Sequence, residues 1–211
     1  MTAGAIDDDK PDQPDGDPWQ LAPRDELALL TLDEVLDRRG HLPSEIQDED
    51  AIPVGIRVAP VGFRVILGLL AGERHVSYSG LTLLASAHGL VLLATDDRMM
   101  KLFRVYTVAS RAGLTSGDQD ALARLGQKSD YRFQHSQAEH TTLPVWRTIH
   151  ARLVELSMAC GISAARLTVI AILVSLLTLP NQRKYREGLE DEVVAFWRFV
   201  AHRERVLRLG T

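Results

Sequence analysis

The sequence predicts a mostly α-helical fold with short β-strands, built from two strand–helix–helix units and additional helices. Two stretches, residues 52–95 and 140–180, each begin with alternating residues and continue as two helix-like segments divided by a glycine and a serine. Hydrophobic residues make up 45% and charged residues 25% of the 211 residues, as in ordinary globular domains. The single cysteine, Cys160, excludes a disulfide framework and a cysteine-rich zinc module.

Residues 1–51 form an acidic leader. They carry 15 acidic and 4 basic residues, a net charge of −11, whereas residues 52–211 carry 20 basic and 13 acidic residues, a net charge of +7. The acidic, proline-containing start is not typical of a signal or transit peptide, and residues 1–20 have the composition of a disordered tail. Residues 25–39 predict one short helix, ended by Gly40, that docks on the body. A basic body favours an acidic partner such as nucleic acid.

The first unit spans residues 52–112. Residues 54–58 alternate between apolar and small or polar side chains, which predicts a strand with one buried face. Pro60 suits the first turn of the next helix, which we expect to end at Gly72. Ser77 or Ser79 would cap the second helix, and the helical pattern continues to about residue 111.

The second unit spans residues 140–180. Leu143 and Val145 share one face of its strand, and Pro144 lies between them without an N–H to donate, so we expect a short or irregular strand. Gly161 would break the first helix, and Ser163 would cap the second. The apolar run 167–179 has 13 residues, fewer than the roughly 20 that span a bilayer, so we expect it to be buried in a core rather than in a membrane.

The remaining segments connect and extend these units. Residues 113–139 predict a short helix, at 114–125, followed by a polar linker. Residues 181–211 predict a long C-terminal helix, over 182–209, that is rich in charges of both signs. Its apolar stripe consists of Leu189, Val193, Phe196, Val200 and Leu207, with Trp197 beside it.

The two units align as an internal repeat. With an offset of 87, Ile56, Val58, Phe63, Ile66 and Leu69 match Leu143, Val145, His150, Leu153 and Leu156. With an offset of 86, Ser77, Leu81, Leu84, Ala85 and Val91 match Ser163, Leu167, Ile170, Ala171 and Leu177. This alignment places one extra residue of the first unit in the turn between its helices. The match is one of pattern, and two unrelated amphipathic hairpins would also produce it.

A strand followed by two helices, the second capped by serine, resembles the ribbon-helix-helix superfamily of DNA-binding proteins, the MetJ/Arc type. The resemblance covers residues 52–95 and 140–180 in tandem. In having tandem units, the chain is similar to plasmid regulators and TraY-like conjugation proteins. It implies a sequence-specific transcriptional regulator of double-stranded DNA in the bacterial cytoplasm, associated with the nucleoid. Two strands, from one chain or from two, would pair antiparallel and enter the major groove. A homodimer is the expected oligomer.

The resemblance also implies the DNA contacts. The outward residues of the ribbon would contact bases: Gly55, Arg57, His140 and Thr142. Arg57 suits bidentate recognition of guanine, and Thr142 suits a base edge or a thymine methyl group. The amino ends of the second helices would contact phosphates: Val76, Ser77, Tyr78, Ile162, Ser163 and Ala164.

Other functions remain open at this point. An accessory DNA-binding protein of a relaxosome or of plasmid partition is one alternative, and a helical protein–protein interaction module without DNA binding is another. The leader would contact transcription machinery, restrain the basic surface or aid solubility. We expect no enzyme activity, no cofactor and no metal, because His135 and His140 lack a third ligand and no glycine-rich phosphate loop occurs.

Overall fold

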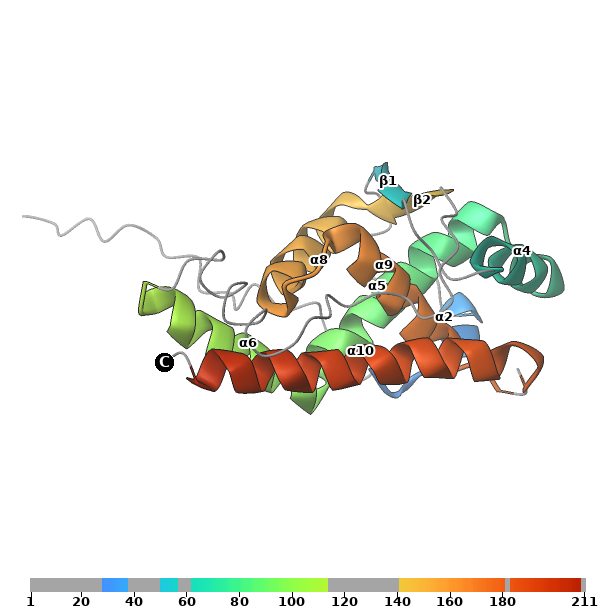
Figure 1. Cartoon of the computed structure of the whole chain (residues 1–211). Helices are drawn as coiled ribbons and strands as arrows, with labels where there is room; N and C mark the ends of the chain where they lie inside the picture. The colour runs from blue at the N-terminus through green and yellow to red at the C-terminus, as the bar shows by residue number, and fades with distance from the viewer. Residues whose placement is uncertain (1–27, 38–49, 57–61, 114–140, 181–182, 210–211) are drawn as a thin grey trace, which may run out of the picture.

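The computed structural model describes residues 28–37, 50–56, 62–113, 141–180 and 183–209, and within them it is mostly helical with two short strands (Figure 1). The elements are α2 (Leu32–Asp37), β1 (Ala51–Ile56), α4 (Phe63–Glu73), α5 (Tyr78–Thr95), α6 (Asp97–Arg111), β2 (Thr141–Trp146), α8 (Arg147–Cys160), α9 (Ala164–Leu176) and α10 (Arg183–Leu209). The predicted fold class is confirmed in these terms. The predicted helix at 114–125 and the linker lie outside the described residues.

The two strands form one antiparallel sheet within a single chain, with Val54 opposite Leu143. The two units therefore share one ribbon, and neither forms a ribbon of its own. β1 contacts α9 of the second unit, and β2 contacts α5 of the first. Because each strand packs on the second helix of the other unit, the units are intertwined rather than side by side.

Helices α5 and α9 cross at the centre of the core, below the ribbon (Figure 1). They approach closely at Gly89, where a Cβ atom would lie 1.8 Å from the carbonyl oxygen of Ala171. A hydrogen bond of 2.9 Å also joins the buried His88 Nδ1 to Ser175 Oγ across the crossing. The close approach of the two helices requires glycine at position 89, because any side chain there would meet the backbone of α9.

Burial on all sides explains the apolar composition of α5 and α9. Two of their buried hydroxyl groups bond within their own helices: Thr82 and Thr168 donate to the carbonyls of Tyr78 and Ala164, at 2.7 and 2.9 Å. Helix α5 has the length and hydropathy of a membrane span, but 61% of its residues are buried in the protein. A core helix has the same composition, and the run 167–179 is likewise largely buried, as expected.

The acidic leader contributes the short helix α2, which packs against α5 through the buried Leu32, Val35 and Leu36. The prediction of one continuous helix over 25–39 is wrong within residues 28–37. A new helix begins at Leu32, because Thr31 and Glu34 form a capping box: the Thr31 N–H donates to Glu34 Oε2 at 2.7 Å. The predicted docking of this segment on the body is confirmed.

Two interactions hold α2 in place beyond its apolar face. The backbone N–H of Leu32 donates to Thr178 Oγ1 at 2.9 Å, after the end of α9. Arg74, after α4, forms a bidentate ion pair with both carboxylate oxygens of Asp33. The leader helix is therefore tied to both units.

On the side opposite the ribbon, α10 lies along α6 (Figure 1). Residues 97–111 are helical to the predicted end at residue 111, but they form a separate helix because α5 ends before Asp96. This residue has extended backbone, and its carboxylate accepts the Arg98 N–H at 2.9 Å, so it caps the separate helix α6. Arg98 in turn lies 3.8 Å above the ring of Trp197, a cation–π contact that joins α6 to α10.

The structure corrects the alignment of the two first helices. Leu67 and Leu70 of α4 are buried, whereas Leu69 is 45% exposed. Helix α8 buries Ile149, Leu153 and Leu156 among others, and these three match Phe63, Leu67 and Leu70 at an offset of 86. The extra residue of the first unit therefore falls between β1 and α4, and not in the turn after α4.

Candidate nucleic-acid interface

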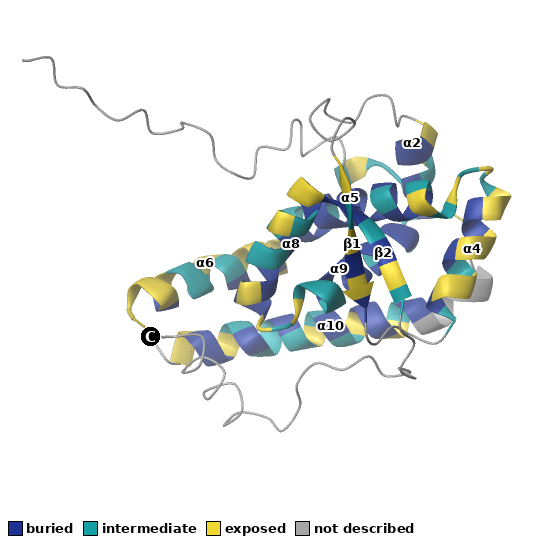
Figure 2. Ribbon diagram, turned by 90° about the horizontal axis from the view of Figure 1, so that it is seen from above, coloured by how far each residue is buried: buried dark blue, intermediate teal, exposed yellow. Residues whose placement is uncertain are grey.

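The outer face of the β1–β2 ribbon is the surface that the sequence predicted to meet DNA (Figure 2, seen from the ribbon side). Val54 and Ile56 of β1 and Leu143 and Val145 of β2 point into the core, as the alternation predicts. Gly55 and Thr142 are exposed and lie directly opposite each other. In the alignment of the two units at an offset of 87, these two residues are equivalent.

The other two predicted base contacts, Arg57 and His140, lie outside the described residues. The structure therefore brings Gly55 and Thr142 together and leaves the placement of Arg57 and His140 as a prediction. Neither Gly55 nor Thr142 carries a charge, so the described part of the ribbon offers Thr142 as its one exposed hydroxyl group.

Strand β2 is short, as predicted, and it pairs with β1 along its whole length, including at Pro144. Pro144 lies directly opposite Pro53 of β1. Because antiparallel pairs alternate between hydrogen-bonded and non-hydrogen-bonded positions, two residues without an N–H fit one non-hydrogen-bonded pair. The ladder thus loses no bond to either proline.

Serine caps the second helix of each unit, as predicted, and Ser77 rather than Ser79 caps the first. Ser77 Oγ accepts the Gly80 N–H at 2.9 Å at the start of α5, and Ser163 Oγ accepts the Arg166 N–H at 3.3 Å at the start of α9. Both serines have extended backbone and are exposed. The capping serines lie beside the other predicted phosphate contacts, which are Val76, Tyr78, Ile162 and Ala164.

The turns before these caps share one hydrogen-bond pattern. Ile162 N–H donates to the Ser157 carbonyl at 3.2 Å, and Val76 N–H donates to the Ala71 carbonyl at 3.0 Å. Gly161 takes the left-handed conformation in the second unit, with φ of 71°. His75 takes it in the first, with φ of 52°, so the prediction that Gly72 ends α4 is wrong.

Tyr78, the first residue of α5, lies near Arg64 of α4 and Thr141 of β2. Burial raises the pKa of its phenol, and the neighbouring Thr141 and Arg64 partly offset that rise. The phenol is therefore neutral at physiological pH and adds no negative charge beside the predicted phosphate contacts.

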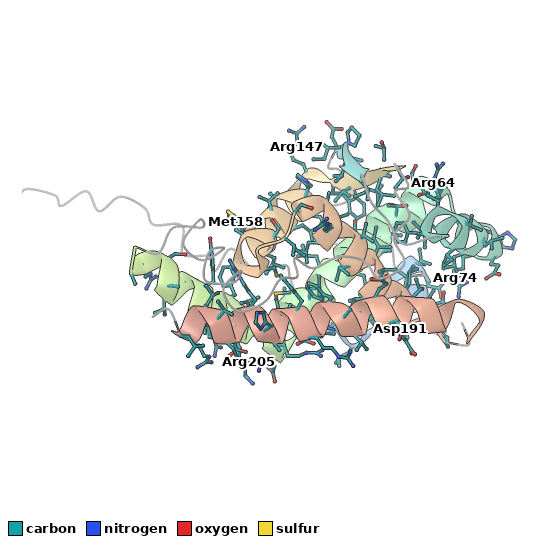
Figure 3. The ribbon with its side chains drawn as sticks, in the orientation of Figure 1. Arg64, Arg74, Arg147, Met158, Asp191 and Arg205 are labelled. Atoms are coloured by element: carbon teal, nitrogen blue, oxygen red, sulfur yellow. The ribbon has the colours of Figure 1, made fainter. Side chains whose placement is uncertain are left out.

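Two arginines that the sequence reasoning did not select are exposed on the ribbon side of the molecule. Arg147 begins α8 directly after β2, and Arg64 lies in the first turn of α4 (Figure 3). The position of Arg147 directly after the predicted strand could have identified it from the sequence. Arg205, by contrast, lies on α10 at the opposite side (Figure 3).

The described residues show neither a cluster of metal ligands nor an accessible thiol. They contain no group of three or more His, Cys, Asp or Glu side chains that could hold a metal ion. Cys160 is fully buried, 3.6 Å from Met99 Sδ, and burial raises the pKa of its thiol to about 12, so it is a poor nucleophile. Comparisons with protein-family models, with curated proteins and with solved structures find no match to this chain.

Proposed function

We propose that this chain is a sequence-specific double-stranded DNA-binding regulator of the ribbon-helix-helix type, which inserts the β1–β2 ribbon into the major groove. One observation carries the proposal: a strand from each unit pairs into a single two-stranded antiparallel ribbon with an exposed outer face. A ribbon of two strands has the width that the major groove admits.

Two further observations support it. Each strand is followed by two helices, and the second helix of each unit has an exposed serine cap with free N–H groups nearby. In this proposal, the two helix ends, one from each unit, would meet the DNA backbone on either side of the groove. Arg147 and Arg64 add positive charge on the ribbon side (Figure 3).

The ribbon is complete in one chain, so DNA binding in this proposal requires no second subunit. The homodimer stays an expectation from the resemblance. A dimer would carry two ribbons and contact two adjacent sites.

Salt dependence of binding tests the proposal. Fluorescence anisotropy with a labelled duplex should give an affinity that falls steeply between about 50 and 200 mM salt, because neutralised phosphates release counterions. Arg147→Ala should lower the slope of log K against log salt by about 0.9, the value for one lost phosphate contact. Arg205→Ala is the matched control, since this exposed arginine lies on the opposite side, and its slope should equal the wild-type slope.

A charge change of the opposite sign completes the test. Asp50 is exposed and directly precedes β1, so Asp50→Asn should strengthen binding by removing repulsion from phosphates. The absence of duplex binding at low salt would refute the proposal and favour a protein–protein interaction module. Equal effects of Arg147→Ala and Arg205→Ala would show that the ribbon side is not the DNA-binding side.

A further inference from the structure

The described outer face of the ribbon is almost entirely apolar. Three cross-strand pairs make up this face: Ala51 with Trp146, Pro53 with Pro144, and Gly55 with Thr142. Ala51, Pro53, Gly55 and Thr142 are exposed, Pro144 is half-buried and Trp146 is 8% exposed. The face carries no charged side chain and no amide side chain. It therefore lacks the groups that hydrogen-bond a guanine or adenine edge in bidentate fashion.

An apolar face of this kind complements one feature of the major groove. Thymine presents a C5-methyl group there, which makes apolar contacts with alanine and with the threonine methyl group. From this match we propose that the ribbon recognises A·T base pairs through their thymine methyl groups, with Thr142 as the principal specificity-determining residue. This inference rests on the proposed function, and it names the bases that the site takes.

The position of charge around the face favours duplex DNA over an apolar protein partner. Arg147 is exposed directly after β2, and Arg64 is exposed on the same side (Figure 3). A groove floor with methyl groups between two phosphate backbones needs this arrangement, an apolar centre with cationic flanks. Thr142 is suited to the central role because it is exposed and carries a methyl group beside its hydroxyl group.

Uracil substitution in the DNA tests the inference. The full chain would first select its preferred duplexes from a random library, and we expect A·T pairs at their centre. Replacing one central thymine by uracil removes a methyl group and keeps base pairing. Each replacement under the ribbon should weaken binding by about fourfold, the value for one buried methyl group. Uracil at positions outside the protected footprint is the control and should have no effect.

A matched pair of variants assigns the contact to Thr142. Thr142→Ser keeps the hydroxyl group and removes the methyl group, so binding should no longer distinguish thymine from uracil at one position. Thr142→Val keeps the methyl group and shape, so the fourfold ratio between thymine and uracil should persist. Both side chains suit an exposed strand position, so the ribbon should stay folded in each.

Two results would overturn the inference while leaving DNA binding intact. Central G·C pairs in the selected duplexes, or equal affinity for thymine and uracil, would show that methyl groups are not recognised. Loss of the ratio in Thr142→Val together with its retention in Thr142→Ser would assign recognition to the hydroxyl group instead. Self-association of the chain without salt-dependent DNA binding would remove the proposed function and the inference together.

Discussion

Replacing Gly89 by alanine should strongly destabilise the protein, although alanine favours helices. A Cβ atom at this position would lie 1.8, 2.3 and 2.9 Å from the O, C and Cα atoms of Ala171. An ordinary contact begins at about 3.4 Å, so α5 and α9 must separate by about 1.6 Å, and no side-chain rotation relieves a clash with backbone. Overpacking of cores costs about 1–3 kcal/mol, and the lost dispersion along the separated helices adds to that cost.

We expect a net loss of about 3 kcal/mol, even after the gain of about 0.5–1 kcal/mol that alanine brings to a helix interior. For a chain of this size the loss corresponds to a fall in Tm of about 6–12 °C. Urea and thermal unfolding, followed by far-UV circular dichroism, measure both quantities. Gly68→Ala is the matched control: position 68 in α4 is exposed and has no atom within 4 Å of a Cβ, so this variant should be slightly more stable than wild type. If Gly89→Ala and Gly68→Ala change the free energy of unfolding in the same direction, the close crossing of α5 and α9 is refuted.

Three further results are expected. His75→Gly should raise the free energy of unfolding by about 1 kcal/mol, because glycine adopts positive φ without strain. Gly161→Ala should lower the free energy of unfolding for the same reason. Urea unfolding measures both changes. Cys160 should not react with a thiol reagent at pH 8 until the protein unfolds, because burial raises the pKa of the thiol to about 12; rapid labelling of the native protein would contradict its burial. Burial of Asp96 raises its pKa, but its bonds to Arg98 and that residue's charge outweigh this and lower the pKa below 3.8. The interaction of ionised Asp96 with Arg98 therefore stabilises the folded protein above pH 3.8, and this stabilisation is lost as pH falls through the lowered pKa. Asp96→Asn should make acid unfolding less pH-dependent.

Features set by local chemistry were predictable from the sequence. Ser77, Ser163 and Gly161 were identified because a hydroxyl that accepts a helix N–H, and a glycine at positive φ, act within a few residues of themselves. The alternation of β1 likewise showed which residues point into the core. His75 gave no such signal, because histidine carries no preference for the left-handed conformation strong enough to mark the end of a helix.

Features set by distant partners were not predictable. Pro144 suggested an irregular strand because its partner, Pro53, is 91 positions away and only the register shows that the two prolines meet. The one-residue shift in the first helices arose because Leu69 and Leu70 are equally apolar, and only packing decides which is buried. Of the candidate site, the pairing of Gly55 with Thr142 was likewise a matter of register. Arg57 and His140 lie outside the described residues and stay predictions.

The shared ribbon of one chain has a consequence for concentration and for sequence change. Two strands on separate chains must find each other, so their pairing weakens on dilution, whereas two strands on one chain have a high effective concentration at any dilution. In a symmetric dimer, each substitution also appears twice, in both halves of the ribbon. Here a change at Gly55 leaves Thr142 as it is, so each half of the ribbon can acquire its own preference without any change in the other.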